Sequence, residues 1–411
     1  MKRFFVFLTL LLPLSFPLRA QDTLTVMQYN LLQYGNYQGY GGCSESTNNT
    51  QRKDECIRTI LNYVKPDVFS VCEFGATQQL QNDFLRHNLN INGVNYWKSD
   101  NIVNYAGQNL INHIFYNSQK MELKKRVALR TSPRDTDVYE FYLKTSSLAQ
   151  GDTTKLVCVV AHPKAGSGYE SERLALMQIA MGYIDQNYSN ENVLIMGDFN
   201  MYRASEPGYQ LLTKTYSNIY SLFVDPLVNS GGVGNWNNNS QFAQFHTQST
   251  RNSSASCFSS GGLDDRFDFI LISDEIYMGF NNLKYVNNSY YAVGNDGQHF
   301  NEDINQDGNS AVPADVAQAL YDGSDHLPVT MKIRVFEKLD VEEHTCDDFV
   351  VYPNPVQDRL TASVKGAFRI VNLVGQTVMV GSDSRSIDVS DLQAGIYFLS
   401  IDGITRKFIK L

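Results

Sequence analysis

Hydrophobic and polar positions follow two patterns along the first 335 residues. Short apolar runs typical of buried strands are separated by segments with an apolar residue every three or four positions, which is typical of helices. The predicted strands cover residues 22–29, 68–72, 109–116, 137–144, 156–161, 193–200, 266–272 and a last run that ends at Val335. The predicted helices cover residues 52–64 and 171–187. Together these elements predict an α/β domain.

The apolar strand at residues 193–200 ends in Asp198, Phe199 and Asn200. Side chains two positions apart in an extended chain leave the same face, so Asp198 and Asn200 share a face. A carboxylate beside an amide suits a hard cation or an activated water on one side and an oxyanion on the other. By itself the pair is equally consistent with a polar strand end.

Polar side chains also mark the ends of the other strands, where α/β proteins tend to bind ligands. They are Asn30, Glu73, His162, Asp268, Asp325 and His326. Metal-assisted phosphoryl transfer needs a hard cation on carboxylate oxygens, a base that activates water and positive donors around the phosphate. The two histidines supply such donors when they are protonated, a form that a neighbouring aspartate favours. The set therefore predicts a site for metal-assisted phosphoryl transfer.

Two cations follow His162, and we expect both Lys164 and Arg173 to contact the phosphate of a substrate. For Arg173 a solvated position on its helix is the alternative. The net charge weighs against nucleic acid bound by bulk attraction, because it is −9 and becomes −12 without Lys2, Arg3 and Arg19. A bound divalent ion offsets such acidity locally, so a nuclease is not excluded.

Two polar segments have a structural and a functional interpretation. Residues 229–262 are rich in Asn, Ser and Gly, and we interpret them as a poorly ordered surface loop, with substrate contact by their aromatics as the alternative. The aromatics are Trp236, Phe242, Phe245 and Phe258. Asp303, Asn305 and Asp307 match the first half of a Ca²⁺ loop, but Ala314 stands where the bidentate Glu belongs. We therefore favour an ordinary turn over a Ca²⁺ site.

The cysteines leave the disulfide pairing open. Cys72 and Cys158 lie in apolar strand patterns and are predicted to be buried thiols. Cys43 with Cys56, or either of them with Cys257, are candidates for a bridge in an exported protein. Since no paired CxxC spacing occurs, a zinc site is not expected.

Both ends of the chain indicate export. Residues 1–20 combine Lys2 and Arg3 with an apolar run at 4–14, which predicts a signal peptide too short to anchor in a bilayer. No later apolar run is long enough for a membrane helix, so we expect a soluble mature protein. A catalytic domain at 21–337 and a charged linker at 338–348 follow. Short strands separated by turns at 349–411 predict a small β-sandwich.

Six motifs, in this order, resemble those of the endonuclease/exonuclease/phosphatase superfamily, which includes deoxyribonuclease I, abasic-site endonucleases, neutral sphingomyelinases and inositol-phosphate 5-phosphatases. They are Gln28-Tyr29-Asn30, Cys72-Glu73-Phe74, Ala161-His162-Pro163, residues 196–200, Arg266-Phe267-Asp268 and Ser324-Asp325-His326. The resemblance covers roughly Asp22 to Val335. It implies a four-layer α/β sandwich, with two packed mixed β-sheets flanked by helices, and in-line attack of a metal-polarised water on a phosphate ester.

Carried over by motif, the resemblance also implies roles for individual residues. Glu73 is the principal Mg²⁺ ligand with Asn30 beside it and Asp325 as a second carboxylate near the metal, and Mn²⁺ is a possible substitute because all these ligands are oxygen donors. Asp198 orients or deprotonates the attacking water, and Asn200 stabilises the phosphate. His326, held by Asp268, contacts the scissile phosphate, and His162 is the other phosphate-facing residue.

This chain departs from the pattern of deoxyribonuclease I at one partner of His162. The glutamate expected there is absent or replaced by an amide, since residues 109–112 read Asn, Leu, Ile, Asn. The resemblance therefore does not say whether His162 is protonated.

The tail resembles the C-terminal sorting domain of type IX secretion at residues 352–355, 388–392, 394–398 and 407–411. This implies an immunoglobulin-like sandwich, recognition by the type IX secretion machinery and release at the bacterial surface or into the medium; an ordinary binding module is the alternative. We expect a secreted monomeric phosphodiesterase that acts on nucleic acid. A sphingomyelinase-like or other small-ester phosphoesterase is one alternative, and a catalytically inactive surface binding protein on the same fold is another.

Overall fold

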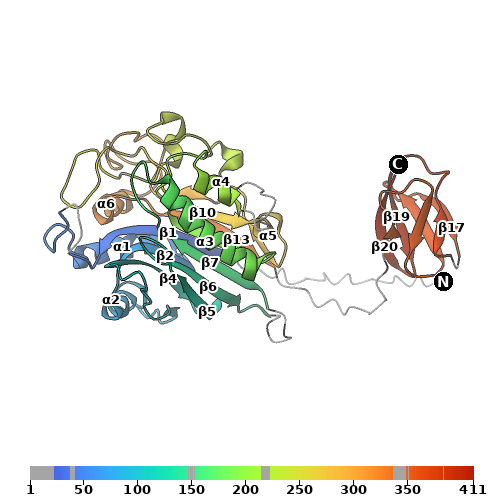
Figure 1. Cartoon of the computed structure of the whole chain (residues 1–411), viewed down its shortest axis with the longest axis horizontal. Coiled ribbons are helices and arrows are strands. Elements are labelled where there is room, and N and C mark those ends of the chain that lie inside the picture. Colours follow the sequence, from blue (N-terminus) through green and yellow to red (C-terminus); the bar gives the residue numbers. More distant parts are fainter. Residues whose placement is uncertain are drawn as a thin grey trace, which may run out of the picture. The chain divides into compact units, whose positions relative to one another are not determined.

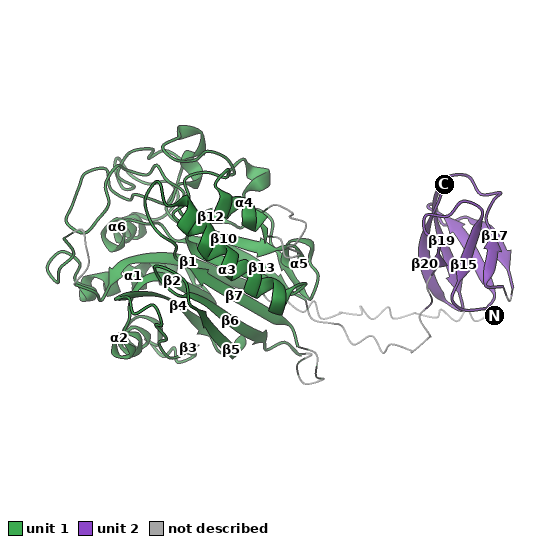
Figure 2. Ribbon diagram, in the orientation of Figure 1, with its two compact units in different colours: residues 1–338 green, residues 339–411 purple. Residues whose placement is uncertain are grey.

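The computed structural model describes residues 23–37, 42–146, 148, 151, 153–213, 223–336, 349, 351–382 and 384–411. The predicted signal peptide and the predicted linker at 338–348 lie outside these residues. The chain divides into two compact units, residues 1–338 and 339–411, which Figure 2 shows in different colours. None of the helices in the described residues is long and apolar enough to cross a bilayer.

Two mixed β-sheets form the centre of the larger unit (Figure 1). The first has the order β11-β13-β1-β2-β4-β3 with β12 beside β13, and comprises β1 (Thr23–Tyr34), β2 (Val68–Gly75), β3 (Trp97–Lys98), β4 (Leu110–Asn117), β11 (Leu283–Tyr285), β12 (Tyr291–Ala292) and β13 (Val329–Val335). The second has the order β5-β6-β7-β8-β10-β9, and comprises β5 (Met121–Leu129), β6 (Thr136–Leu143), β7 (Lys155–Ala161), β8 (Val193–Asp198), β9 (Phe223–Val224) and β10 (Asp268–Ser273). The pairs β1–β2 and β7–β8 are parallel, whereas β1–β13 and β8–β10 are antiparallel.

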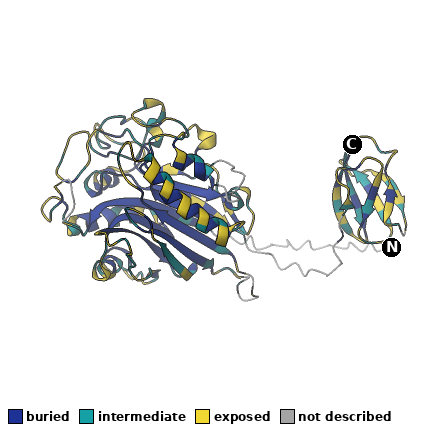
Figure 3. Cartoon of the chain, viewed as in Figure 1, coloured by how far each residue is buried: buried dark blue, intermediate teal, exposed yellow. Residues whose placement is uncertain are grey.

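Strand β8 shows why these segments form strands covered on both faces. Leu194 and Met196 lie in the core between the two sheets, whereas Val193 and Ile195 lie in the core on the outer face of the second sheet. Because successive side chains of a strand point to opposite faces, a strand covered on both sides reads as a continuous apolar run. Figure 3 shows most of the strands of this unit buried, whereas β5 is largely intermediate in exposure.

Helices cover the two outer faces. They are α1 (Thr50–Val64), α2 (Gln78–Phe84), α3 (Glu170–Tyr188), α4 (Pro207–Thr213) and α6 (Ala314–Gly323), with a π turn at Leu85–Leu89 and 3-10 turns at Val228–Ser230 and Ser240–Phe245. The short helix α5 (Asp274–Met278) instead places Ile276 in the core between the two sheets. Ile57 of α1 and Leu320 of α6 share a core with the first sheet, and Met177 of α3 and Leu212 of α4 share one with the second. The layers are therefore helices, sheet, sheet and helices, which confirms the predicted four-layer α/β sandwich.

The interpretation of residues 229–262 as a poorly ordered loop is wrong. Trp236 is fully buried in the outer core of the second sheet, and its ring nitrogen donates to the carbonyl of Met201 at 2.8 Å. A disulfide joins Cys257 of this insert to Cys43 in the loop after β1. The insert is an ordered part of the domain because its few apolar residues are used as anchors. The composition of the insert does not indicate this order, because polar residues surround these apolar residues in the sequence.

Two of the other cysteines follow the sequence pattern: Cys72 and Cys158 are buried free thiols, which confirms their prediction. Cys56, a candidate for a bridge, is instead free and buried. Cys346 lies outside the described residues.

The smaller unit is built from short strands around its own core, as predicted. One sheet has the order β14-β15-β18 and the other β17-β16-β19-β20. Their strands are β14 (Val351–Tyr352), β15 (Arg359–Ala362), β16 (Phe368–Asn372), β17 (Thr377–Gly381), β18 (Ser386–Asp388), β19 (Gly395–Ile401) and β20 (Ile404–Lys410). Leu360 of the first sheet and Leu399 of the second lie in one apolar cluster, so the two sheets form a small sandwich.

Candidate active site

Strand topology brings polar side chains from both sheets of the larger unit to one edge. Asp198 ends β8 and lies opposite Asp268, the first residue of β10. Gly197 permits the close approach of β7, because a Cβ at this position would lie 1.8 Å from the carbonyl oxygen of Ala161, and its φ of +151° is one that side chains rarely adopt. His162 directly follows β7, so this packing sets it beside Asp198.

One carboxylate oxygen of Asp198 is the centre of the site. The side-chain nitrogen of Asn30, from the first sheet, donates to Asp198 Oδ2 at 2.9 Å. The Nε2 atoms of His162 and His326 lie 3.3 Å and 3.7 Å from the same oxygen. The other oxygen, Oδ1, accepts from the backbone nitrogen of Asn200 at 3.1 Å. All five side chains are at least nine-tenths buried, so these polar groups face one another and not bulk water.

His326 is held by a carboxylate on its far side. Its Nδ1 lies 2.8 Å from Asp268 Oδ2, and its Nε2 lies 3.4 Å from the side-chain nitrogen of Asn30. Burial disfavours the charged ring, but Asp268 and Asp198 outweigh burial and raise the pKa of His326 well above its ordinary value. The two carboxylates therefore favour the protonated form of His326.

His162 has the opposite electrostatic setting. Burial lowers its pKa well below the ordinary value, and the charges of Arg134 and His326 lower it further. Within the described residues its Nδ1 has no hydrogen-bond partner. The amide at Asn112, in the region where a glutamate was expected, donates to the carbonyl of Asp135. Burial therefore favours the neutral form of His162.

The pKa of Asp198 is shifted toward neutral pH. Burial raises the pKa of this carboxyl group to about 7, while the positive charge of His326 and the hydrogen bond from Asn30 act in the other direction. A buried carboxylate with a pKa near the working pH is suited to accept a proton from water.

A second group of carboxylates lies where β1 and β2 leave their regular pairing. The β1–β2 register shifts between Asn30 and Tyr34, and the backbone of Glu73 is left-handed with φ +57°. Glu73 Oε2 accepts from the backbone nitrogen of Gln33, and Asp325 Oδ2 accepts from that of Ser259, both at 3.0 Å. Bulges of this kind re-aim side chains next to functional sites.

A buried lysine lies within electrostatic reach of these carboxylates. Lys53 Nζ donates to the carbonyls of Leu31 and Leu32 at 2.6 and 2.7 Å. Burial lowers its pKa to about 7, against the opposing charges of Asp325 and Glu73. Lys53 thus fastens the end of β1, the strand that carries Asn30.

Three expected site residues lie at the edge of this cluster or outside it. The side-chain nitrogen of Asn200 lies 3.4 Å from the carbonyl of Pro163, and Lys164 is exposed, with its ammonium 5.1 Å from the ring centre of Tyr169. Arg173 is fully buried and donates to both oxygens of Glu206 at 3.0 and 3.1 Å. Since that guanidinium is enclosed and paired, the expectation that Arg173 contacts substrate is corrected: it is a structural residue.

The segment that matches the first half of a Ca²⁺ loop takes part in the surface hydrogen-bonding network. Asp303 accepts from the backbone nitrogen of Asn252, and Asn305 donates to Gln318. Within the described residues, no three His, Cys, Asp or Glu side chains lie close enough to be grouped as a metal site. The ordinary turn favoured from the sequence stays a prediction.

Sequence patterns missed three neighbours of the site. Lys53 lies four and seven positions before Ile57 and Ile60, so the helical period that places these two in the core also points Lys53 inward. Arg134 donates to the carbonyl of His162 at 3.3 Å, and Gln248 approaches His326 to 2.7 Å. Arg134 and Gln248 come from irregular segments, where no periodic pattern predicts their positions.

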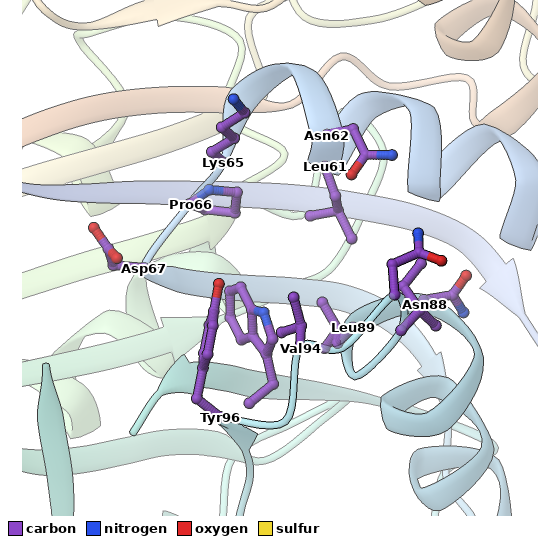
Figure 4. A pocket seen from close by; sticks show the side chains of 12 residues that line it. Leu61, Asn62, Lys65, Pro66, Asp67, Asn88, Leu89, Val94 and Tyr96 are labelled. Atoms are coloured by element: carbon purple, nitrogen blue, oxygen red, sulfur yellow. The ribbon is translucent and has the colours of Figure 1, made fainter. Parts of the chain in front are cut away.

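A separate hollow of about 320 Å³ lies at the other end of β2 (Figure 4). Its lining includes Leu61, Lys65, Asp67, Asn88 and Tyr96. Asp67 directly precedes β2, whereas Glu73 lies near the opposite end of that strand. The hollow contains none of the clustered residues and is not their binding site.

Comparison with known protein families identifies the smaller unit. Residues 350–410 match a secretion system C-terminal sorting domain. The sorting domain thus accounts for the β-sandwich at the end of the chain. A search of curated proteins finds no match.

Solved structures similar to the chain include proteins of the endonuclease/exonuclease/phosphatase family. One is the family protein of Bacteroides vulgatus, at 14% identity and a TM-score of 0.49, covering 77% of this chain and 100% of that one. Another is the human Nocturnin catalytic domain with bound sulfate, at 12% identity and a TM-score of 0.48, covering 77% of this chain and 98% of that one. A third is D. rerio TDP2 complexed with a single-strand DNA product, at 13% identity and a TM-score of 0.48, covering 76% of this chain and 100% of that one.

Proposed function

We propose that the chain is a secreted, divalent-metal-dependent phosphodiesterase that hydrolyses nucleic acid. One observation carries the proposal: Asn30, His162 and His326, from three separate segments, converge on a single buried oxygen of Asp198. A cation, a neutral imidazole and a carboxylate with a pKa of about 7 within this small space are the groups that phosphate hydrolysis needs.

The chemistry of the donors fits a hard cation at Glu73, Asn30 and Asp325. All three offer oxygen atoms, which Mg²⁺ and Mn²⁺ prefer. Asp325 Oδ1 is buried without a hydrogen-bond partner among the described residues, as expected of an oxygen reserved for a ligand outside the chain. Two carboxylates and one amide suit Mg²⁺, which usually keeps several waters. When bound, the metal would polarise the phosphate and neutralise its charge.

The protein groups divide the remaining work. Asp198, with its pKa of about 7, accepts the proton of the attacking water. His326, as a cation held by Asp268, donates a hydrogen bond from Nε2 to a phosphate oxygen in which charge develops. Neutral His162 and the amides of Asn30 and Asn200 orient water and phosphate without adding charge. Exposed Lys164 is positioned two residues after His162 to meet a further phosphate of the substrate.

Location supports nucleic acid as the substrate. The chain ends in a secretion system sorting domain, and extracellular nucleic acid is an abundant phosphodiester for an exported enzyme. We propose export by a signal peptide at 1–20 followed by the type IX machinery. The net charge of −9 means that binding depends on a few local cations and the metal, so activity should be sensitive to salt.

The test is turnover by the full exported chain with Mg²⁺, Mn²⁺ or a chelator, on plasmid DNA, RNA, sphingomyelin and bis-p-nitrophenyl phosphate. Asp198→Ala is the inactive variant, and Asp307→Ala, a surface carboxylate outside the cluster, is the matched control. DNA or RNA cleavage that is lost in Asp198→Ala and in chelator supports the proposal. Turnover of sphingomyelin alone would assign the lipid branch. No turnover of any substrate would leave a binding protein and refute the proposal.

A further inference from the structure

Another pocket, of about 340 Å³, lies between the start of α1, the insert and the end of α6. Its lining includes Asn49 and Arg52 at the start of α1, Arg251, Ser256 and Phe258 of the insert, and Asp322 of α6. The Cys43–Cys257 disulfide joins the loop before α1 to the insert. Two walls of the pocket are therefore linked covalently.

The charged side chains of this pocket include more cations than carboxylates. Arg52, Lys53 and Arg251 lie around a single acidic residue of the lining, Asp322. Lys53 is already engaged by two backbone carbonyls, which leaves two guanidinium groups against one carboxylate. In a chain whose net charge is −9, such a local surplus of positive charge favours an anionic ligand.

Arg251 is held firmly, and one end of its guanidinium remains available. The group lies between the rings of Phe258 and Tyr321, whose centres are 4.1 and 4.0 Å away. Its Nη2 donates to the carbonyl of Tyr321 at 3.0 Å and to Asp322 Oδ1 at 3.4 Å. Its Nη1 makes no hydrogen bond to any residue that the structure describes. A guanidinium fixed by stacking is preorganised to bind a phosphate oxygen.

Arg52 supplies a second guanidinium that can reach an anion. Its side chain is 66% exposed, and its Nη2 lies 3.0 Å from the same oxygen of Asp322. An exposed ion pair contributes little stability, so Arg52 can exchange this contact for an anion at small cost. The backbone nitrogen of Arg52 is already bonded to the side chain of Asn49. The cationic side chains, and not the start of the helix, therefore define this site.

Hydrogen bonds connect the pocket to a proposed metal ligand, Asp325. Thr250, which precedes Arg251, donates from its backbone nitrogen to the carbonyl of Asp325 at 3.1 Å. Ser259, which follows Phe258, donates from its backbone nitrogen to Asp325 Oδ2 at 3.0 Å. Because the pocket adjoins the proposed metal site, an anion bound there fits a second group of the same substrate. A nucleic-acid strand offers such a group, since it carries a phosphate at every nucleotide.

We propose that this pocket is an anion site, in which Arg52 and the available Nη1 of Arg251 bind a second phosphate group of a nucleic-acid substrate. The inference rests on the proposed function and narrows its substrate class to phosphodiesters with more than one phosphate. It also gives the insert a task, because Arg251 and Phe258 form one wall of the pocket. A substrate with a single phosphate, such as bis-p-nitrophenyl phosphate, leaves the pocket empty.

The kinetic test compares the full exported chain with its Arg52→Gln variant. The matched control is Arg86→Gln, because Arg86 is 69% exposed and is also paired with an aspartate. We expect the ratio of kcat/KM on oligothymidylate to kcat/KM on bis-p-nitrophenyl phosphate to fall about five- to tenfold in Arg52→Gln, mainly through KM, as for the loss of one charge-assisted contact made on binding. The control should keep the wild-type ratio. An unchanged ratio in Arg52→Gln, or an equal fall in both variants, would overturn the proposal.

Binding without turnover keeps the inference separate from the proposed function. The chain is titrated into fluorescein-labelled oligothymidylate in chelator, and the dependence of log Kd on log salt is measured by fluorescence anisotropy. Each phosphate neutralised on a single strand contributes about 0.7 to this slope, so Arg52→Gln combined with Arg251→Met should lower it by about 0.7. Arg52→Lys, which keeps the charge, and Arg86→Gln should retain the wild-type slope.

The two hypotheses then fail in different ways. An unlowered slope in the double variant would overturn the anion site even if DNA is cleaved. A lowered slope without cleavage of any phosphodiester would refute the proposed function, while the anion site would stand.

Discussion

Asp198 lies between two histidines that are buried almost equally, at 2% exposure for His162 and 3% for His326, yet their surroundings differ. His326 has Asp268 at one ring nitrogen and Gln248 at the other. His162 has Asp198 near Nε2, and its Nδ1 has no partner among the described residues. Burial disfavours charge in both rings, so the partners decide: the pKa of His326 is raised and that of His162 is lowered.

The difference assigns the roles of the two sides. Titratable groups whose environments push their pKa values apart are the acids and bases of a site. Under the proposed function, the His326 side would supply positive charge to the phosphate, and the His162 side would supply a neutral surface that does not compete for the proton of Asp198. A second cation at His162 would stabilise ionised Asp198, lower its pKa and weaken it as a base.

The largest effect should separate the two histidines directly. His326→Gln removes a cation from the phosphate and should lower kcat/KM by about 10³-fold, whereas His162→Gln replaces one neutral polar group by another and should cost only about tenfold. The measurement is turnover of plasmid DNA or bis-p-nitrophenyl phosphate at pH 7. Comparable losses in the two variants would show that both rings act alike and would refute this comparison.

Removal of the charge behind His326 should have the next largest effect, and one that depends on pH. In Asp268→Asn the pKa of His326 falls, because a carboxylate that raises it is gone. Turnover requires the protonated ring, so the alkaline limb of the profile should move to lower pH. We expect a loss of about tenfold near pH 6 that grows beyond about 100-fold by pH 9.

The control for this profile is Asp264→Asn, which alters a nearby carboxylate that makes no contact with the His326 ring among the described hydrogen bonds and whose pKa shift comes from burial. Its alkaline limb should stay near that of the wild type. An unshifted limb in Asp268→Asn would mean that the observed alkaline limb belongs to another group.

Sequence patterns predicted the parts of this site that depend on strand order. Apolar runs that end in Asp198 or His162 identify strands, and parallel neighbours bring their ends to one edge. The His326–Asp268 pair came from family motifs, because 58 positions separate the two residues and no local rule joins them. The α/β class followed from two-sided apolar strands alternating with helical segments, whereas the four-layer sandwich was implied by the family resemblance.

What sequence patterns missed lies in irregular backbone. The bulge that re-aims Glu73 depends on left-handed residues that are not glycine, and the burial of Trp236 depends on a core formed by distant elements. The expectation that Arg173 contacts substrate was wrong for a related reason. A cation near a catalytic histidine suggests a substrate contact, but only the structure shows that Glu206 encloses it.

A smaller effect should come from the His162 side. Arg134 lowers the pKa of His162, so Arg134→Gln should raise it and bring the ring closer to protonation at acid pH. We expect turnover at pH 8 within about threefold of wild type and a larger relative loss near pH 5, where a charged His162 would oppose proton transfer to Asp198. Titration of the His162 ¹⁵N signals checks the direction. The control is Arg86→Gln, which removes an exposed ion pair between Asp83 of α2 and Arg86 of the following turn. It should leave the His162 signals unchanged.

The smallest effect on activity should come from the disulfide, which belongs to the His326 side. The Cys43–Cys257 bond joins the loop after β1 to the insert that carries Gln248 and Ser259, and its two cysteines are 214 positions apart. A bond that closes so long a loop stabilises mainly by restricting the unfolded chain, typically by about 2–4 kcal/mol. Cys43→Ser with Cys257→Ser should therefore lower the urea midpoint while kcat at 25 °C changes less than about twofold.

The two sides can also be compared by which histidine signals change in the disulfide variant. Because the insert contacts His326 through Gln248 and Asp325 through Ser259, the disulfide variant should broaden or shift the ¹⁵N signals of His326 and leave those of His162 unchanged. Reductant should reproduce the effect in the wild type and add nothing in the variant. Equal changes at both histidines would mean that the insert supports the whole edge of the sheets, and the two sides would then not be independent.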